Sequence, residues 1–216
     1  MNRAVRGPLT AGVAGVHLVE NLAEIARLKE PDCAAVICQR TDQAAILDWI
    51  GDLPAARLPK VRTALAVANA GEVLEQIVVD AGMPDCSQRD AFVEDVVVLA
   101  KAFAALMGCE HLRLRLDPVS TNACRRFHVD AMHARLVCTY RGAATQYGTA
   151  LDGDDPQVIA AAKTGDPMVM RGTLWPESPS ADLRHRSPPI EGSGETRLLL
   201  VLDPVFDLEK ELAREP

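Results

Sequence analysis

Two short segments, far apart in the chain, carry side chains that could bind a metal ion. The first is Phe127-His128-Val129-Asp130 and the second is His185-Arg186-Ser187-Pro188-Pro189. Side chains two residues apart on a strand point to the same face, so His128 and Asp130 would project together. Two imidazoles and one carboxylate on one side of a metal form a facial triad, which leaves three coordination positions open. The sequence therefore predicts a metal site made by His128, Asp130 and His185.

A cation follows the second segment at a spacing that allows it to return to the same site. Arg197 lies twelve residues after His185 and opens the apolar segment that ends at Asp203. A guanidinium can bind a carboxylate through two parallel hydrogen bonds. We therefore expect Arg197 to bind the carboxylate of a small acid. The alternative is a strand arginine that pairs with a surface carboxylate of the protein itself.

Composition limits the class of protein. The 216 residues are 48% hydrophobic and 25% charged, which is typical of a globular chain and large enough for one sizeable domain. The net charge of −7 argues against nucleic acid as a partner, because phosphate binding needs a clustered basic face.

The cysteines and the apolar runs indicate the compartment. None of the six cysteines forms a CxxC pair, and no apolar run is long enough for a secretory signal or a bilayer span. We therefore expect a cytoplasmic protein with free thiols and no membrane partner.

The elements that must position these side chains change in type at about residue 110. Within one domain, 1–216, we expect an α-rich part over 1–109 and a β-rich part over 110–216. Apolar spacing and capping residues predict helices over 19–28, 41–50, 71–81 and 87–107, with a buried strand at 33–38. Strand candidates in the second part are 111–116, 127–130, 134–140, 167–171 and 197–202, with a brief helix at 157–162. Many short strands between Gly- and Pro-rich turns favour a barrel or a sandwich.

The order of the candidate site residues resembles that of the iron(II)- and 2-oxoglutarate-dependent oxygenases. That superfamily carries His-x-Asp on an early strand of a double-stranded β-helix, a second histidine on a late strand and an arginine beyond it. The resemblance covers about residues 110–203, although the family often has serine where this chain has Leu199.

The resemblance implies an α+β fold in which a jelly-roll, cupin-like double-stranded β-helix is buttressed by the N-terminal helices. It implies that His128, Asp130 and His185 bind Fe(II) and that Arg197 binds 2-oxoglutarate. A strand tyrosine often helps to hold the cosubstrate carboxylate in such proteins, which assigns that role to Tyr140.

Over most of its length the chain is also similar to an uncharacterised bacterial family of unknown function. The similarity lies in the segments 122–130, 135–142 and 185–189. That family is associated with zinc-homeostasis genes and with metal-handling GTPases, which implies a place close to metal handling.

Other interpretations remain open on the same residues. Cys124 lies four residues before His128, and Zn²⁺ accepts sulfur, nitrogen and oxygen ligands. Cys124, His128, Asp130 and either His185 or His133 would then close the zinc site of a non-catalytic accessory protein of metal homeostasis. A barrel that has lost its metal and binds a small acid or a protein is a third interpretation. His128 and Asp130 could also be structural, and the Arg-flanked His185 could lie in an anion-binding loop.

The leading prediction is an oxygenase that uses Fe(II) and 2-oxoglutarate on a small-molecule or protein substrate. A homodimer is one option for its assembly.

Overall fold

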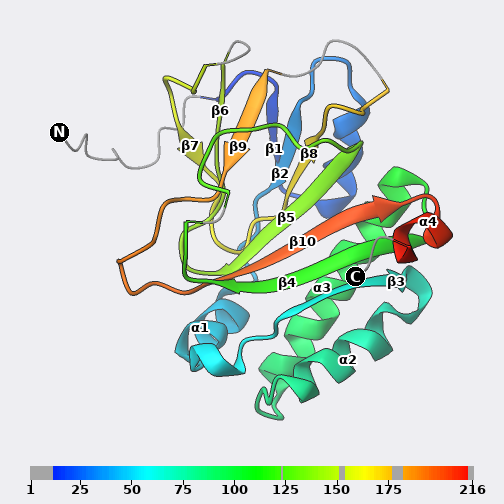
Figure 1. Ribbon diagram of the computed structural model, residues 1–216, viewed down its shortest axis with the longest axis vertical. Coiled ribbons are helices and arrows are strands. Elements are labelled where there is room, and N and C mark those ends of the chain that lie inside the picture. Colours follow the sequence, from blue (N-terminus) through cyan, green and yellow to red (C-terminus); the bar gives the residue numbers. More distant parts are fainter. Residues whose placement is uncertain (1–11, 123, 151–153, 177–181, 214–216) are drawn as a thin grey trace.

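The computed structural model describes residues 12–122, 124–150, 154–176 and 182–213, which form two β-sheets with helices against one of them (Figure 1). The large sheet has seven strands in the order β1-β2-β8-β5-β10-β4-β3, and the small sheet has three in the order β7-β6-β9. The strands are β1 (Val16–Val19), β2 (Ala35–Cys38), β3 (Val61–Ala66), β4 (His111–Val119), β5 (Ala134–Arg141), β6 (Gln146–Thr149), β7 (Ala160–Ala161), β8 (Met168–Arg171), β9 (Leu183–Arg186) and β10 (Arg197–Val205).

From β4 onward the chain crosses repeatedly between the two sheets. The strands β4, β5, β8 and β10 lie in the large sheet, whereas β6, β7 and β9 lie in the small one. Between β4 and β5 the chain visits the small sheet at His128, through a single antiparallel bridge to His185. This alternation between facing sheets is the double-stranded β-helix that the sequence predicted. The strands β1, β2 and β3 come from the N-terminal part and extend the large sheet at its edges.

The helices of the N-terminal part cover one face of the large sheet, and a short C-terminal helix contacts Arg113 on the other face. The helices are the 3₁₀ helices η1 (Leu22–Lys29), η2 (Ala55–Arg57) and η3 (Val67–Asn69) and the α-helices α1 (Ala44–Asp52), α2 (Ala70–Asp80), α3 (Ser87–Met107) and α4 (Leu208–Leu212). Helix α3 buries Phe92, Leu99 and Phe103 and ends at Gly108, whose φ of 65° is the left-handed conformation that closes many helices.

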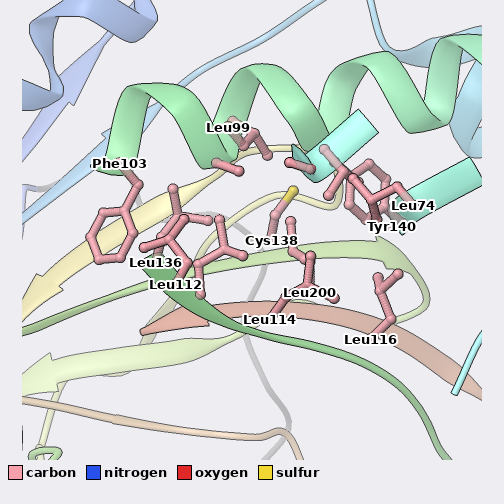
Figure 2. Packing of buried hydrophobic residues seen from close by; sticks show 14 of the residues in the cluster. Leu74, Leu99, Phe103, Leu112, Leu114, Leu116, Leu136, Cys138, Tyr140 and Leu200 are labelled. Carbon is pink, nitrogen blue, oxygen red and sulfur yellow. The ribbon is translucent and has the colours of Figure 1, made fainter. Parts of the chain in front are cut away.

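The principal core lies between these helices and the large sheet. Strict alternation along β4 turns its leucines toward α3, where they meet apolar residues of β5 and β10. Figure 2 shows this packing, with Leu99 and Phe103 of α3 above Leu112, Leu136 and Leu200 of the sheet. A second apolar cluster lies on the other face of the sheet and includes Tyr147 and Leu183 from the small sheet.

The sequence located most long elements and misjudged several short ones. The helices predicted over 71–81 and 87–107 are confirmed to within a residue, and the buried strand at 33–38 is β2. The helix predicted at 157–162 is wrong, because this segment is extended and supplies β7. The strand predicted at 127–130 is reduced to the bridge at His128, and the N-terminal part has the strands β1 and β3 in addition to the predicted β2. Within the described residues, no helix combines the length and apolar character that crossing a membrane requires.

Candidate metal centre

The three predicted metal ligands lie together beside the small sheet. One ligand atom from each of His128, Asp130 and His185 lies within 4.8 Å of the others. The Nε2 atom of His185 is 3.3 Å from Oδ2 of Asp130, and Nε2 of His128 is 3.6 Å from Oδ1. The structure therefore brings together residues that are far apart in sequence, and it places their ligand atoms within reach of one metal ion.

Strand pairing sets the separation of the two histidines. His128 and His185 exchange both backbone hydrogen bonds, at 3.1 Å and 3.0 Å, as a directly opposed antiparallel pair does. Side chains of such a pair lie side by side on one face of the sheet, and here the ring centroids are 4.5 Å apart. Both imidazoles are thus fixed by backbone geometry, even though His128 belongs to no regular strand.

The backbone of Asp130 is held by the segment that follows β8. Its carbonyl oxygen accepts a hydrogen bond of 2.9 Å from the Thr173 amide. Gly172 allows this close approach, because a Cβ atom there would lie 2.1 Å from the Met132 oxygen and 2.6 Å from the Asp130 oxygen. Only glycine fits against this turn, so the position of Asp130 depends on Gly172.

The carboxylate of Asp130 has one engaged oxygen and one free oxygen. Oδ1 accepts a hydrogen bond of 2.7 Å from Nη1 of Arg135, whereas Oδ2 is buried and makes no hydrogen bond to any described residue. Buried polar atoms without partners are rare in native proteins. An unpartnered oxygen that faces imidazole nitrogen is the environment that a divalent cation completes, so the donor set fits a transition metal.

The second nitrogen of His128 fixes its orientation. Nδ1 lies 2.9 Å from the carbonyl oxygen of Arg126, and because a carbonyl only accepts, this nitrogen carries the proton. The lone pair is then on Nε2, which points toward the carboxylate. Hydrogen bonding of the non-ligating nitrogen to a carbonyl is typical of metal-binding histidines.

The charges of the cluster favour an ionised carboxylate beside a neutral imidazole. Burial opposes ionisation of Asp130, but the two neighbouring imidazoles and the charge of Arg135 outweigh it and hold its pKa well below the usual range. Burial lowers the pKa of His185 and favours its neutral, ligating form. The adjacent carboxylate of Asp130 raises the pKa of His128.

Arg197 is buried between the two sheets. Alternation places it on the face of β10 that carries Leu199 and Val201, both of which belong to the cluster shared with the small sheet. It is fully buried, its Nε donates to the carbonyl oxygen of Ala143, and its two terminal nitrogens lack partners among the described residues. Burial lowers the pKa of this guanidinium. Two unpartnered terminal nitrogens fit the two oxygens of a carboxylate.

Tyr140 is not brought to this site. It lies with Leu136 and Cys138 on the opposite, helix-facing side of β5, and its hydroxyl donates to the carboxylate of Asp95 in α3. Figure 2 places it in the core beside Leu74. This placement does not support the predicted contact between Tyr140 and a cosubstrate bound at Arg197.

The additional zinc ligands considered from sequence are also not brought to the cluster. Within the part of the chain that the structure describes, Cys124 is exposed and does not join the group of ligand atoms formed by the triad. The ring of His133 instead packs edge-on against Phe206, with centroids 5.1 Å apart.

Sequence reasoning missed Arg135, which contacts the candidate metal ligand Asp130, and Asp203, which holds Arg135. Arg135 contacts both carboxylates, and its Nε lies 2.7 Å from Oδ1 of Asp203. The sequence pattern that could have pointed to Arg135 is the alternation along β5, which places this residue on the same face as Val137 and away from Tyr140.

The fold is thus a double-stranded β-helix with a candidate site of two histidines and one aspartate. The chain belongs to the family described as Protein of unknown function (DUF1826), whose model matches residues 20–203. No curated protein matches the chain.

Solved structures similar to this chain include a dioxygenase for auxin oxidation from rice, at 14% identity and a TM-score of 0.48, with 89% of this chain and 83% of that chain covered. The corresponding Arabidopsis thaliana enzyme, bound to 2-oxoglutarate, is 9% identical with a TM-score of 0.46 and covers 91% and 94%. A Pseudomonas putida prolyl-4-hydroxylase is 14% identical with a TM-score of 0.37 and covers 78% and 95%. Because these TM-scores lie below 0.5, we infer the function from this chain's own residues.

Proposed function

We propose that this protein is an oxygenase that depends on Fe(II) and 2-oxoglutarate. The observation that carries the proposal is the convergence of His128, Asp130 and His185 around an unpartnered carboxylate oxygen. Two histidines and one carboxylate with open positions are the ligand set of non-haem Fe(II) oxygenases. The buried, unpartnered ends of Arg197 add a place for the carboxylate of a cosubstrate.

Each residue has a separate task in this proposal. Nε2 of His128, Nε2 of His185 and Oδ2 of Asp130 would hold the metal from one side. Arg197 would bind the distal carboxylate of 2-oxoglutarate, while the apolar residues between the sheets exclude water from that end of the site. When bound, Fe(II) and 2-oxoglutarate together supply the oxidising power drawn from O₂.

A closed zinc site is less well supported by the geometry. A structural zinc site needs four protein ligands, whereas a catalytic site keeps a position open. Cys124 does not lie within the group of ligand atoms, and the triad alone provides three ligands. The observed cluster therefore fits an open site.

Metal content tests the proposal. Untagged wild-type protein, Cys124→Ala and His128→Ala would be analysed by plasma mass spectrometry after anaerobic loading with Fe(II). We expect near-stoichiometric iron in the wild type and in Cys124→Ala, and none in His128→Ala. Decarboxylation of labelled 2-oxoglutarate by the loaded wild type would follow. Zinc that the wild type binds and that is lost both in Cys124→Ala and in His128→Ala would contradict the open site. The absence of metal from every sample would contradict the proposal.

A further inference from the structure

Arg135 lies on β5 between the partly buried carboxylate of Asp130 and the buried carboxylate of Asp203, which come from different parts of the chain. Its Nη1 donates to Oδ1 of Asp130 at 2.7 Å, whereas Nε and Nη2 form a fork on Asp203 at 2.7 Å and 2.9 Å. The bidentate fork on Asp203 fixes the plane of the guanidinium. One arginine thus ties the candidate metal ligand to the end of β10.

Asp203 is itself held by charges on the neighbouring strand. Arg113 of β4 lies directly opposite Asp203, with its Nη1 3.7 Å from Oδ2. Arg113 also forms a fork on Glu211 of helix α4. The charges therefore alternate in sign from Asp130 through Arg135, Asp203 and Arg113 to Glu211. A partly buried network of this kind can fix an arrangement that no single pair would hold.

The contact with Arg135 determines which oxygen of Asp130 is free. The terminal torsion of an aspartate is soft, so an unrestrained carboxylate can rotate and offer either oxygen or both to a metal. Here Oδ1 is occupied by Arg135, and Oδ2 faces His185 at 3.3 Å without a hydrogen bond. A carboxylate with only one free oxygen occupies one coordination position and leaves the others open.

We propose, on the basis of the metal site proposed above, that Arg135 is a positioning residue, anchored by Asp203, that makes Asp130 a single-oxygen ligand. It does not touch the reacting groups and acts through Asp130. Loss of its fork lets the carboxylate turn away from the two histidines, so metal binding weakens. Outer contacts of this kind are typically worth about 10- to 100-fold in metal affinity.

Co²⁺ titration of the metal-free, full-length protein, followed by visible absorption, tests this role without any measurement of activity. Arg135→Lys keeps the positive charge but cannot make the three bonds of the guanidinium. Asp203→Asn leaves Arg135 in place and removes its charged anchor. The matched control is Arg141→Lys, on the same strand, because Arg141 donates to the backbone carbonyls of Leu53 and Ile50.

We expect Arg135→Lys to weaken Co²⁺ binding by about 10-fold or more, Asp203→Asn to weaken it in the same direction, and Arg141→Lys to bind as the wild type does. Wild-type affinity in both Arg135→Lys and Asp203→Asn would overturn the role of Arg135 while leaving the metal site intact. If Arg135→Lys does not fold, Asp203→Asn decides. Wild-type protein that binds no Co²⁺ would overturn the metal site itself, and this role with it.

Discussion

The two faces of the large sheet are built from the same strands and differ in how their polar groups are used. The helix-facing side is dominated by buried leucines of β4, β5 and β10, each worth about 1.5–3 kcal/mol by burial. The side toward the small sheet carries Arg135, Arg197 and Asp203 among its apolar residues. Strand alternation therefore gives each strand one side that stabilises the fold and one that forms the candidate site.

Polar groups are buried on both faces, and the Asp95 cluster on the helix side differs from the candidate site in how completely it is hydrogen-bonded. On the helix side, Asp95 accepts hydrogen bonds from Arg40 and Tyr140 on its two oxygens. On the other side, an oxygen of Asp130 and two nitrogens of Arg197 make no hydrogen bond to any described residue. A polar cluster whose hydrogen bonds are all made is consistent with a structural role, whereas the buried groups of the candidate site that lack hydrogen bonds indicate a place for a ligand.

Replacing Asp130 on the site side should test the comparison between the two faces most sharply. Asp130→Ala removes a metal ligand, so its effect should exceed the 10- to 100-fold that outer contacts typically cause, and we expect Fe²⁺ and Co²⁺ binding to fall by more than about 100-fold. The measurement is metal titration of the purified variant. Retained affinity would show that Asp130 is not a ligand.

The matched change on the helix side is Asp95→Ala, with the opposite expected pattern. It leaves Arg40 buried without its ion pair, which typically costs about 3–5 kcal/mol of unfolding free energy. Urea denaturation measures this loss, and the folded variant should bind metal as the wild type does. A selective loss of metal with unchanged stability would contradict the division between the two faces.

Gly172→Ala should reduce both stability and metal binding, because it acts on the backbone that carries Asp130. The added Cβ must displace the Met132 and Asp130 carbonyls, and overpacking of this kind costs about 1–3 kcal/mol. We expect reduced stability together with weaker metal binding. Gly71→Ala in α2 is the control, since no atom lies within 4 Å of its added Cβ. Equal behaviour of the two variants would argue against the role of Gly172.

The smallest expected effect on the candidate site belongs to Tyr140→Phe. Burial raises the pKa of Tyr140 well above its ordinary value, so the hydroxyl stays protonated and donates to Asp95. Its loss should cost about 1.5–3 kcal/mol, as for other hydrogen bonds to charged groups, with no change in 2-oxoglutarate binding. Calorimetric titration of the metal-loaded variant checks this. Weaker 2-oxoglutarate binding would show that Tyr140 contributes to the cosubstrate site.

The sequence was most informative where chemistry restricts the residue type. His128, Asp130 and His185 were singled out because few side chains bind metals and their order resembles that of a known superfamily, and the structure brings them together. The role predicted for Tyr140 was carried over from that superfamily, although the period of two already placed this residue with Leu136 and Cys138 on the apolar face.

Other features depend on contacts that local patterns do not encode. The strands of the small sheet are only two to four residues long, and β9 has the polar sequence Leu-Arg-His-Arg, which resembles a loop. The fork between Arg135 and Asp203 joins positions 68 residues apart, so no short-range spacing predicts it.

Binding of 2-oxoglutarate is the most direct test of the claim that unpartnered groups between the sheets form a site. Anaerobic calorimetric titration would compare metal-loaded wild type, Arg197→Met and the helix-side variant Tyr140→Phe. We predict binding in the wild type and in Tyr140→Phe, and its loss in Arg197→Met with metal retained. Metal-loaded wild type that does not bind 2-oxoglutarate, or Arg197→Met that binds it equally well, would contradict the account.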